Sequence, residues 1–388
     1  MPPTAHAKLS ASSSKRWLHC TAAPGLEATL PDKDPGPFAK EGTLAHEFCE
    51  VFGRRKLAGM REAEYAAKLD ELMRQEYFDK EMLDTAEFYA NYLYEVSMRY
   101  KHAPHAQFEI RVDLSDWIPE GFGTCDACII GGDELFIADY KHGKGVAVDS
   151  LGNTQMRLYA LGALKFFSPV YGDQINRVTM AIIQPRITEH VNEAMMSVKE
   201  LLAWGESIKP LALKAYTGEG AEFKAGDWCK FCKAKAVCRA RAAGFTALEE
   251  FKDINPAALS DTEIGDLLKR GAELTDWYSS LKDYAQERIL GGGSVPGWKI
   301  VAGRASRVWT DEEKALDAIK AAGYPEAVIY DRKAKTLAQL EKTIGKKDFA
   351  DICGNFIHTP TGSPTLVVET DRREAYNLAA IEMEGLKK

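Results

Sequence analysis

The sequence predicts an α/β fold in which a mixed central sheet is flanked by helices. Three observations support this prediction. Two apolar-rich runs, 124–130 and 134–140, flank a Gly-Gly-Asp break and predict an antiparallel hairpin. The run 177–183 is almost entirely apolar, as is typical of a strand buried on both faces. Apolar residues recur at helical spacing in 62–101, which predicts helices that cover the sheet.

The composition is that of an ordinary globular protein, with 45% apolar and 28% charged residues. The 388 residues are enough for two or three domains. The net charge of −7 provides no overall basic field, which counts against passive coating of DNA but not against an enzyme with a local basic groove. The sequence has no apolar run of about 18 residues, and its first residues lack the layout of a secretory signal. We therefore expect a cytoplasmic protein without a membrane segment.

The N-terminal hundred residues are expected to be mainly helical. A serine-rich segment precedes a short helix that ends at Cys20. The stretch 23–42 is rich in proline, glycine and aspartate, so we expect an extended loop there. Thr43 then caps a helix that carries His46 in its first turn. The segment 62–101 contains neither proline nor glycine and predicts one or two long helices.

The middle of the chain is expected to supply the sheet and two further helices. Residues 108–114 alternate between apolar and polar side chains, which predicts a strand with one polar face. The helices are expected at 151–167 and 197–216, and the first carries Gln155 and Tyr159 four residues apart on one face. The polar face of the strand carries Glu109, Arg111 and Asp113.

The hairpin carries the residues of greatest chemical interest. If its turn is the two-residue Gly132-Asp133, Asp126 lies opposite Asp139, and a longer turn would shift this register. Lys141 projects from the same face as Asp139 because side chains alternate along a strand. Two carboxylates this close repel unless a cation lies between them, and oxygen ligands suit Mg²⁺ or Mn²⁺. The plainer interpretation is a solvated strand edge.

Five short motifs follow one another in order between residues 9 and 241. Each motif alone is weak, and their shared order is specific. Together they resemble the RecB-type nucleases of the PD-(D/E)XK superfamily, including phage-encoded members. The motifs are Gly42-x3-His46, a strand with Glu109, Gly123-x2-Asp126, Asp139-Tyr140-Lys141 and Gln155-x3-Tyr159.

The resemblance implies a role for each of these residues. Lys141 would be the catalytic lysine beside the scissile phosphate. Gln155 and Tyr159 would support the active site and the DNA strand, with an ordinary helix surface pair as the alternative. Glu109 would be the acidic residue of the preceding strand. A lone histidine such as His46 is more often a hydrogen-bonded bystander on general grounds. The metal ligands would be the side chains of His46, Asp126 and Asp139 and the backbone carbonyl of Tyr140.

Cys229-x2-Cys232-x5-Cys238 forms a second group of candidate ligands, since a reducing compartment favours metal binding over disulfides. Three thiolates need a fourth ligand, and Cys20 is the best candidate. The arrangement resembles the iron–sulfur members of the family, among them AddB and the CRISPR-adaptation nucleases. There a [4Fe–4S] cluster ties the N-terminal segment to the C-terminal end of the nuclease domain. Structural Zn²⁺ in the same thiolates is the alternative.

The remaining four cysteines are interpreted as structural. Cys125 and Cys128 flank Asp126 on a strand, where alternation predicts that they point to opposite faces. Cys49 and Cys353 are expected to be buried thiols.

Basic and aromatic residues near these sites are candidates for DNA contacts. Lys144 lies in a Gly-Lys-Gly loop after the hairpin, and Trp228, Lys230 and Arg239 surround the cysteines. Such a mixture suits phosphate contacts and base stacking on a single strand, although a solvated helix with core aromatics would look similar. No Walker motif occurs, so no ATP hydrolysis is expected.

The predicted organisation is a nuclease domain over 1–244, with a helical insertion at 62–102, and an α+β region over 245–388. A capping box at 260–263 opens a helix of about thirty residues, which ends at Gly291. In the last hundred residues, a helix is expected after Thr310 and another from about 372. The strands are expected at 298–302, 306–309 and 365–369.

The function implied by the resemblance is metal-dependent hydrolysis of DNA, most directly by an exonuclease acting on ends or single strands. Recombination, replication or end processing would be its setting, with recombination or single-strand-binding proteins as partners and the host cytoplasm as the location if it is phage-encoded. Two alternatives stay open at this point: a non-catalytic DNA-binding scaffold with the same fold, and a structure-specific endonuclease.

Overall fold

The structure is a computed structural model of the chain. It describes residues 7–31, 36–188, 190–246, 261–301, 312–322, 336–353 and 356–357. The chain forms two compact units, Met1–Ile300 and Val301–Lys388. The sheet and all candidate site residues belong to the first unit. The predicted domain boundary at 244 stays a prediction.

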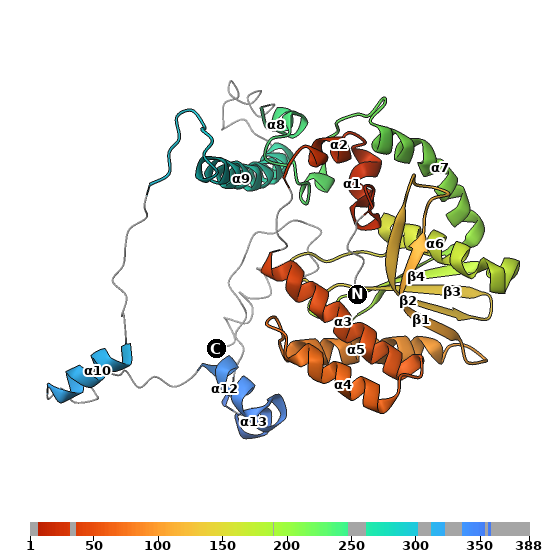
Figure 1. The fold of residues 1–388 in the computed structure, drawn as a ribbon, viewed down its shortest axis with the longest axis horizontal. Coiled ribbons are helices and arrows are strands. Elements are labelled where there is room, and N and C mark those ends of the chain that lie inside the picture. Colours follow the sequence, from red (N-terminus) through yellow and green to blue (C-terminus); the bar gives the residue numbers. More distant parts are fainter. Residues whose placement is uncertain are drawn as a thin grey trace, which may run out of the picture. The chain divides into compact units, whose positions relative to one another are not determined.

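A five-stranded mixed sheet forms the centre of the first unit (Figure 1), which confirms the predicted fold class. Strands β3 and β4 pair in parallel, and the other neighbours pair antiparallel. The edge strand β5 was not predicted from the sequence. In the order in which they pair, the strands are β1 (His105–Asp113), β2 (Phe122–Gly131), β3 (Glu134–Tyr140), β4 (Arg177–Ile183) and β5 (Asn192–Ser197).

The turn between β2 and β3 sets the register of the catalytic candidates. The ladder begins at the pair Gly131–Glu134, so the turn is the two-residue Gly132-Asp133 predicted from the sequence. Gly132 adopts a φ of 60°, which glycine tolerates without steric cost. The regular pairing ends at Ala127–Ala138. The next residues along the same register are Asp126 and Asp139, as the two-residue turn predicts.

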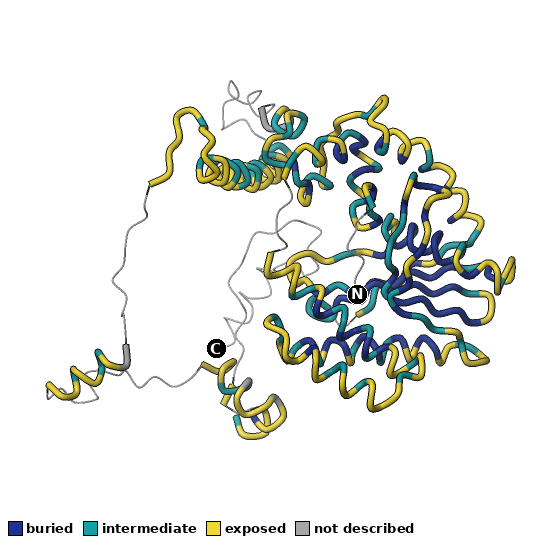
Figure 2. The backbone as a smooth tube through the Cα atoms, viewed as in Figure 1, coloured by how far each residue is buried: buried dark blue, intermediate teal, exposed yellow. Residues whose placement is uncertain are grey.

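Helices cover both faces of the sheet, and the buried residues gather on the strands and on the helix faces that meet them (Figure 2). One core lies beneath α6 and α7 with the N-terminal η1 and α1, and the other lies beneath α3, α4 and α5. The two helices expected in 62–101 are α4 and α5. The helices are η1 (Ala11–Ser13), α1 (Ser14–His19), α2 (Ala23–Ala28), α3 (Pro37–Leu57), α4 (Glu62–Met73), α5 (Glu81–Ser97), α6 (Thr154–Tyr171), η2 (Gly172–Gln174) and α7 (Val198–Thr217).

The prediction of an extended loop over 23–42 is wrong for most of that stretch. Helix α2 occupies its first part, and α3 begins at Pro37, where the fixed φ of proline suits the first helical position. Thr43 therefore lies inside α3 and donates its hydroxyl to the carbonyl of Ala39 instead of capping the helix. His46 consequently lies in the third turn of α3 rather than the first.

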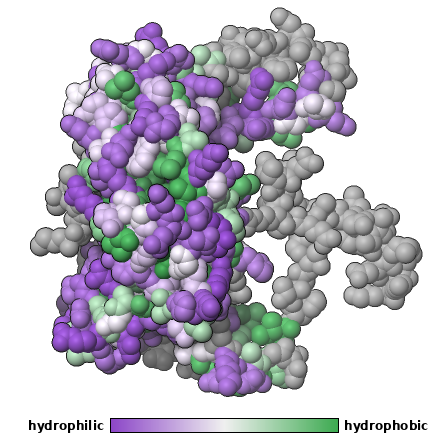
Figure 3. Space-filling model, turned by 90° about the vertical axis from the view of Figure 1, so that its right-hand side faces the viewer, coloured by the Kyte–Doolittle hydropathy of each residue, from purple (hydrophilic) through white to green (hydrophobic). Residues whose placement is uncertain are grey.

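Close packing between α6 and the sheet depends on a glycine. A Cβ at Gly162 would lie 2.7 Å from the Val112 side chain and 2.9 Å from that of Leu114, so only glycine lets α6 approach β1 this closely. The C-terminal end of α6 is less well covered, with Phe166 and Val170 exposed. Viewed from the right-hand side of Figure 1, the surface has a hydrophobic area between hydrophilic regions (Figure 3).

The chain beyond α7 is helical wherever the structure describes regular elements. The thirty-residue helix expected after residue 260 is α9, and it ends at Leu290 before the predicted glycines. The helix expected after Thr310 is α10. The elements are η3 (Asp227–Cys229), α8 (Arg239–Thr246) and α9 (Asp261–Leu290) in the first unit, and α10 (Glu312–Ala321), α12 (Leu337–Ile344) and α13 (Lys346–Cys353) in the second.

The strand expected at 298–302 is wrong for its described part. Residues 298–301 are not in a strand, and the side chains of Trp298 and Val301 are exposed. The other two expected strands and the helix from about 372 lie outside the described residues. In the described part of the chain, no helix is long and apolar enough to span a membrane.

Candidate active site

The site begins where β2 separates from β3. After the last regular pair, the Asp126 carboxylate accepts a hydrogen bond from the backbone N–H of Tyr140 at 2.8 Å through Oδ2. The same oxygen lies 3.2 Å from Nδ1 of His46, which α3 brings in from the helical layer. Asp126 therefore joins the end of the hairpin to a helix that is far away in the sequence.

The backbone of Glu109 is distorted opposite Asp126. Glu109 has a φ of 51°, which is uncommon for a residue other than glycine. Phe108 packs in the core under α3 and α5, whereas Ile110 packs in the core under α6. Residues two apart normally share a face, so β1 changes faces at Glu109. Such strain is often kept at functional sites.

The alternation of side chains in β2 is interrupted at Asp126, opposite Glu109. The prediction that Cys125 and Cys128 point to opposite faces is therefore wrong. Both are buried in the core under α6, with their Sγ atoms 3.3 Å apart. The irregular backbone at Asp126 places both thiols on one side. Cys49 is buried as expected, whereas Cys353 is only partly buried.

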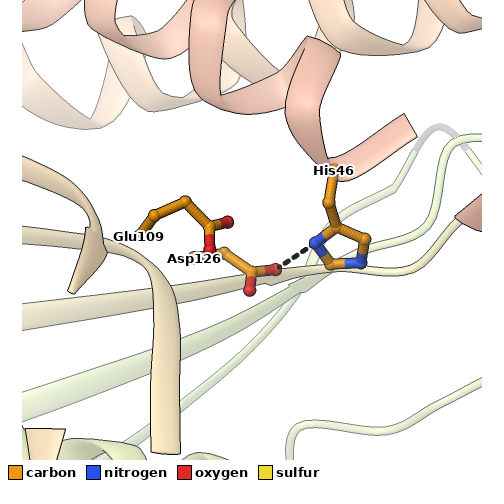
Figure 4. Close-up of side chains that lie close together, drawn as sticks. All are labelled: His46, Glu109 and Asp126. Carbon is orange, nitrogen blue, oxygen red and sulfur yellow. Dashed lines mark ion pairs between the residues drawn. The ribbon is translucent and has the colours of Figure 1, made fainter. Parts of the chain in front are cut away.

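A candidate metal-ligand group forms around the separated strands (Figure 4). One ligand atom each from His46, Glu109 and Asp126 lies within 4.8 Å of the others, and this is the only such group of three His, Cys, Asp or Glu residues in the described chain. His46 descends from a helix, and the two carboxylates rise from neighbouring strands. The structure therefore brings together three of the residues that the motifs pointed to.

The other motif residues form a connected chain of contacts beside this group. Lys141 Nζ lies 2.8 Å from Oδ2 of the buried Asp139 carboxylate. The Gln155 amide donates to Oδ1 of Asp139 at 3.0 Å and accepts from Lys141 at 3.3 Å. The same amide donates to the Tyr159 hydroxyl at 3.2 Å. Gln155 thus fixes the relative positions of the carboxylate and the ammonium group.

The charges in the site perturb one another strongly. Burial would lower the pKa of His46, but the carboxylates of Asp126, Asp139 and Glu109 outweigh burial and raise it to about 9. Burial, followed by repulsion from Asp126, raises the pKa of Glu109 to about 8. These shifts have the pattern expected of a cluster of carboxylates with too few compensating cations.

The aspartates shift in opposite directions. Burial would raise the pKa of Asp126, but the neighbouring His46 and Lys141 hold it below its usual value. Burial raises the pKa of Asp139, with Lys141 opposing the shift and Asp126 adding to it. Burial would lower the pKa of Lys141, but Asp139 outweighs burial and raises it. Lys141 is therefore a cation in the resting site.

The four cysteines of the second motif line one small cavity. Cys20 follows α1 directly, and the other three lie about two hundred residues later, from Cys229 at the end of η3 to Cys238 just before α8. The backbone N–H of Lys224 points to Cys20 Sγ at 3.4 Å. The cavity is lined by Cys20, Cys229, Cys232 and Cys238 together with Arg16, Lys235 and Arg241.

Hydrogen bonds between the two segments hold this cavity together. Arg16 of α1 donates to the backbone carbonyl of Phe231 at 3.1 Å and pairs with Glu27 of α2. Glu27 in turn accepts from the backbone N–H of Lys233 at 2.8 Å. The N-terminal helices and the cysteine segment are therefore joined through the protein's own side chains.

The candidate DNA-contacting residues lie in different surroundings. Trp228 stacks on His19 with ring centroids 4.3 Å apart and donates its indole N–H to Lys224 at 2.7 Å. Lys230 and Arg239 are exposed near the cysteines. Lys144 is paired with Glu81 at 3.0 Å. The structure does not bring Lys144 together with the other three.

One polar group beside the site was missed by the sequence patterns. Arg186, in the turn after β4, contacts Glu41 of α3 and Glu81 of α5. Arg186 also donates to the backbone carbonyl of His142, which lies two residues after β3. Neither residue belongs to a recognisable motif, and a lone arginine after a buried strand gives no specific signal.

The fold and the site define an α/β protein with a group of candidate metal ligands beside an ion-paired lysine. Residues 6–374 match the family described as "Protein of unknown function (DUF2800)", and the chain belongs to this family.

Three solved structures with some similarity to the chain have low TM-scores. A protein named as a candidate exonuclease from Eubacterium rectale is 12% identical, with a TM-score of 0.33, over 61% of this chain and 87% of that one. The protein SSO0001 is 14% identical, with a TM-score of 0.25, over 59% and 96% of the two chains. LHK-Exo in complex with dAMP is 11% identical, with a TM-score of 0.24, over 45% and 92%.

Proposed function

We propose that the chain is a metal-dependent deoxyribonuclease, most directly an exonuclease that hydrolyses DNA from ends or single strands. The observation that carries this proposal is the placement of the Lys141–Asp139 pair beside the ligand group of His46, Glu109 and Asp126. A cation site next to a partly buried lysine suits hydrolysis of a phosphodiester bond, because negative charge grows on the phosphate during the reaction.

The donor set fits a divalent cation. Carboxylate oxygens and one imidazole nitrogen suit Mg²⁺ or Mn²⁺. Asp126 raises the pKa of Asp139, so the two carboxylates lie close enough to repel each other, and a cation between them would relieve that repulsion. His46, Asp126 and Asp139 would hold the ion, with Glu109 and the Tyr140 carbonyl beside them. When bound, the ion would supply Lewis-acid activation of water and of the phosphate.

The protein's own groups then have distinct tasks. Lys141 is held by Asp139 and Gln155, so its ammonium group can neutralise charge that develops on the phosphate. Gln155 keeps Asp139 oriented. Tyr159 supports Gln155 from the next turn of α6 and is itself almost fully buried, which places it behind the reacting groups.

We also propose that Cys20, Cys229, Cys232 and Cys238 hold a [4Fe–4S] cluster that joins the two ends of the nuclease region. All four thiols line one cavity, which fits a shared inorganic group. Structural Zn²⁺ in the same four thiolates is the alternative, because a tetrahedral set of four sulfurs suits either metal.

Linear and covalently closed circular DNA test the nuclease proposal in Mn²⁺ and in Mg²⁺. We expect the wild type to degrade linear DNA and to leave the closed circle intact, and we expect Lys141→Ala to leave both intact. Cutting of the circle would replace the exonuclease with an endonuclease. Metal-independent binding without degradation of any DNA form would contradict the nuclease and favour a scaffold.

The cluster proposal is tested by anaerobic purification. We expect a brown protein with an absorption band near about 400 nm, as Fe–S charge transfer predicts. A colourless protein that contains stoichiometric zinc would contradict the cluster. A role in phage recombination or end processing, with recombination or single-strand-binding proteins as partners, is the setting we propose for this activity.

A further inference from the structure

One guanidinium group beside the site joins three separate elements. Arg186 donates through Nη1 to Glu41 of α3 at 2.8 Å and through Nη2 to Glu81 of α5 at 3.0 Å. It also donates to the backbone carbonyl of His142, which follows β3, at 3.2 Å. We call Arg186, Glu41, Glu81 and His142 the Arg186 clamp.

The arginine and the histidine of the clamp are shielded from water, whereas the Glu41 and Glu81 side chains are 26% and 40% exposed. The Arg186 side chain is 12% exposed and that of His142 is 6% exposed. Glu41 has its pKa held down by Arg186 and His142 against the opposing effect of burial, and Arg186 and Lys144 do the same for Glu81. Removing the arginine would leave Glu41 with only His142 and Glu81 with only Lys144 as ion-pair partners.

The clamp closes a ring of contacts through the candidate metal site. On one side, His46 of α3 contacts Asp126 Oδ2 directly. On the other side, Glu41 of the same helix contacts His142 at 3.0 Å, and His142 contacts the Tyr140 hydroxyl at 2.9 Å. The backbone N–H of Tyr140 then returns to the same Asp126 oxygen. Helix α3 is thus tied to Asp126 by two independent routes.

The position of His46 needs such a tie because it comes from a different layer. The carboxylate candidates Asp126 and Asp139 are fixed by the sheet, whereas His46 is carried by α3 and depends on how that helix lies over the sheet (Figures 1 and 4). Glu41 lies five residues before His46 on that helix. Arg186 lies three residues after Ile183, the last residue of β4. The Ile183 carbonyl accepts a hydrogen bond from the N–H of Lys141 at 2.9 Å, which ties this end of β4 to the residue that follows β3.

We propose that Arg186 is a positioning residue that sets α3, and with it His46, at the correct distance from Asp126 for a divalent cation. The inference deepens the proposed nuclease function and rests on its metal site. Arg186 touches neither the ligands' donor atoms nor the lysine in this arrangement; it acts through Glu41 and His142. Loss of a residue that holds metal ligands in position without binding the metal itself typically weakens metal affinity or activity by about 10-fold to 100-fold.

Mn²⁺ binding to the intact protein without DNA tests the proposal, with free Mn²⁺ followed by electron paramagnetic resonance. We expect Arg186→Met to raise the Kd for Mn²⁺ about tenfold or more. Arg186→Lys should raise the Kd less, because a lysine can pair with one carboxylate but cannot span two. The control is Arg177→Met. Arg177 is the first residue of β4, at the end of that strand far from Arg186, and it pairs with Glu134 of β3.

Urea unfolding of both methionine variants separates positioning from simple stabilisation. A purely structural arginine would lower the unfolding midpoint and leave the Mn²⁺ affinity of the folded protein unchanged, as we expect for Arg177→Met. A Kd for Arg186→Met within twofold of the wild type would overturn the proposal. If Arg186→Met yields no folded protein, Arg186→Lys decides in the same way.

The same variants distinguish failure of the clamp from failure of the nuclease. Weakened Mn²⁺ binding in a protein that degrades no DNA would uphold the clamp and remove the proposed function. Metal-dependent degradation with unchanged Mn²⁺ affinity in Arg186→Met would uphold the function and remove the clamp.

Discussion

At the scale of single residues, Asp126 organises the site because one of its oxygens serves two structural layers. Its Oδ2 contacts the backbone N–H of Tyr140 and the imidazole of His46. Its register opposite Asp139 could be predicted from the sequence, because a two-residue turn fixes every later pair in the hairpin. The approach of His46 and Glu109 could not be derived from spacing, because it depends on how α3 packs and on the unusual φ of Glu109.

Gln155 offers a test of orientation without loss of charge. Gln155→Leu removes the contacts to Asp139 and Lys141, so we expect the rate of DNA degradation to fall by roughly 10-fold to 100-fold. The rate at saturating Mn²⁺ is the measurement. Gln174→Leu, in the exposed η2 turn, is the matched control and should degrade DNA at the wild-type rate. Equal rates for the two variants would contradict the orienting role.

The His46–Asp126 pair predicts a pH dependence of stability in metal-free protein. A pKa raised to about 9 means that the protonated imidazole stabilises the fold fully below its ordinary pKa of 6.5. This contribution is lost as the pH rises through 9. Urea unfolding in a chelator should therefore show stability falling between these values, and His46→Gln should flatten the change. An unchanged pH profile in His46→Gln would argue against the pair.

At the scale of elements, apolar patterning located the hairpin, β4, α6 and α7, because these elements are buried along much of their length. It failed where local composition and tertiary packing disagree. The proline-rich and glycine-rich stretch 23–42 looked like a loop, yet α2 and the start of α3 form there. Strand β5 was missed because only Ala194 of its six residues is buried, so it lacks a hydrophobic pattern.

The contact between α6 and β1 predicts a sharp effect of one methyl group. Gly162→Ala would force the new Cβ against Val112 and Leu114, and we expect a loss of about 1–3 kcal/mol in the free energy of unfolding. Gly42→Ala, in α3, meets no atom within 4 Å and should leave stability unchanged or slightly higher. Urea unfolding of both variants makes the comparison, and equal stabilities would show that α6 can move away from β1.

At the scale of the whole molecule, the cysteine cavity joins segments that are about two hundred residues apart. Closing a loop of this length removes roughly 5 kcal/mol of chain entropy from the unfolded state in the simple loop-closure treatment. The spacing of Cys229, Cys232 and Cys238 indicated a shared site from the sequence, with Cys20 as the expected fourth ligand, and all four line the same cavity in the structure. Of the three predicted C-terminal strands, the described part of 298–302 is not a strand, and the other two lie outside the described residues, so their prediction has no structural outcome.

Loss of this link should be visible in thermal unfolding. Cys20→Ser should abolish the absorption band near about 400 nm and lower Tm by roughly 10 °C, because each kcal/mol shifts the Tm of a domain of this size by about 2–4 °C. Cys353→Ser, in the second compact unit, should change neither. A Tm for Cys20→Ser equal to that of the wild type would contradict the idea that the cysteines hold the region together.

The central claim is that the grouped carboxylates and His46 bind a divalent ion that Lys141 needs for DNA hydrolysis. Its most direct test is the rate of linear DNA degradation as a function of Mn²⁺ concentration in the wild type, Lys141→Met and Asp126→Asn. We expect Lys141→Met to lower the maximal rate by about 100-fold or more at a similar half-saturating Mn²⁺ concentration, and Asp126→Asn to raise that concentration. Degradation by Lys141→Met at the wild-type rate, or no degradation by the wild type in Mn²⁺ or Mg²⁺, would contradict the claim.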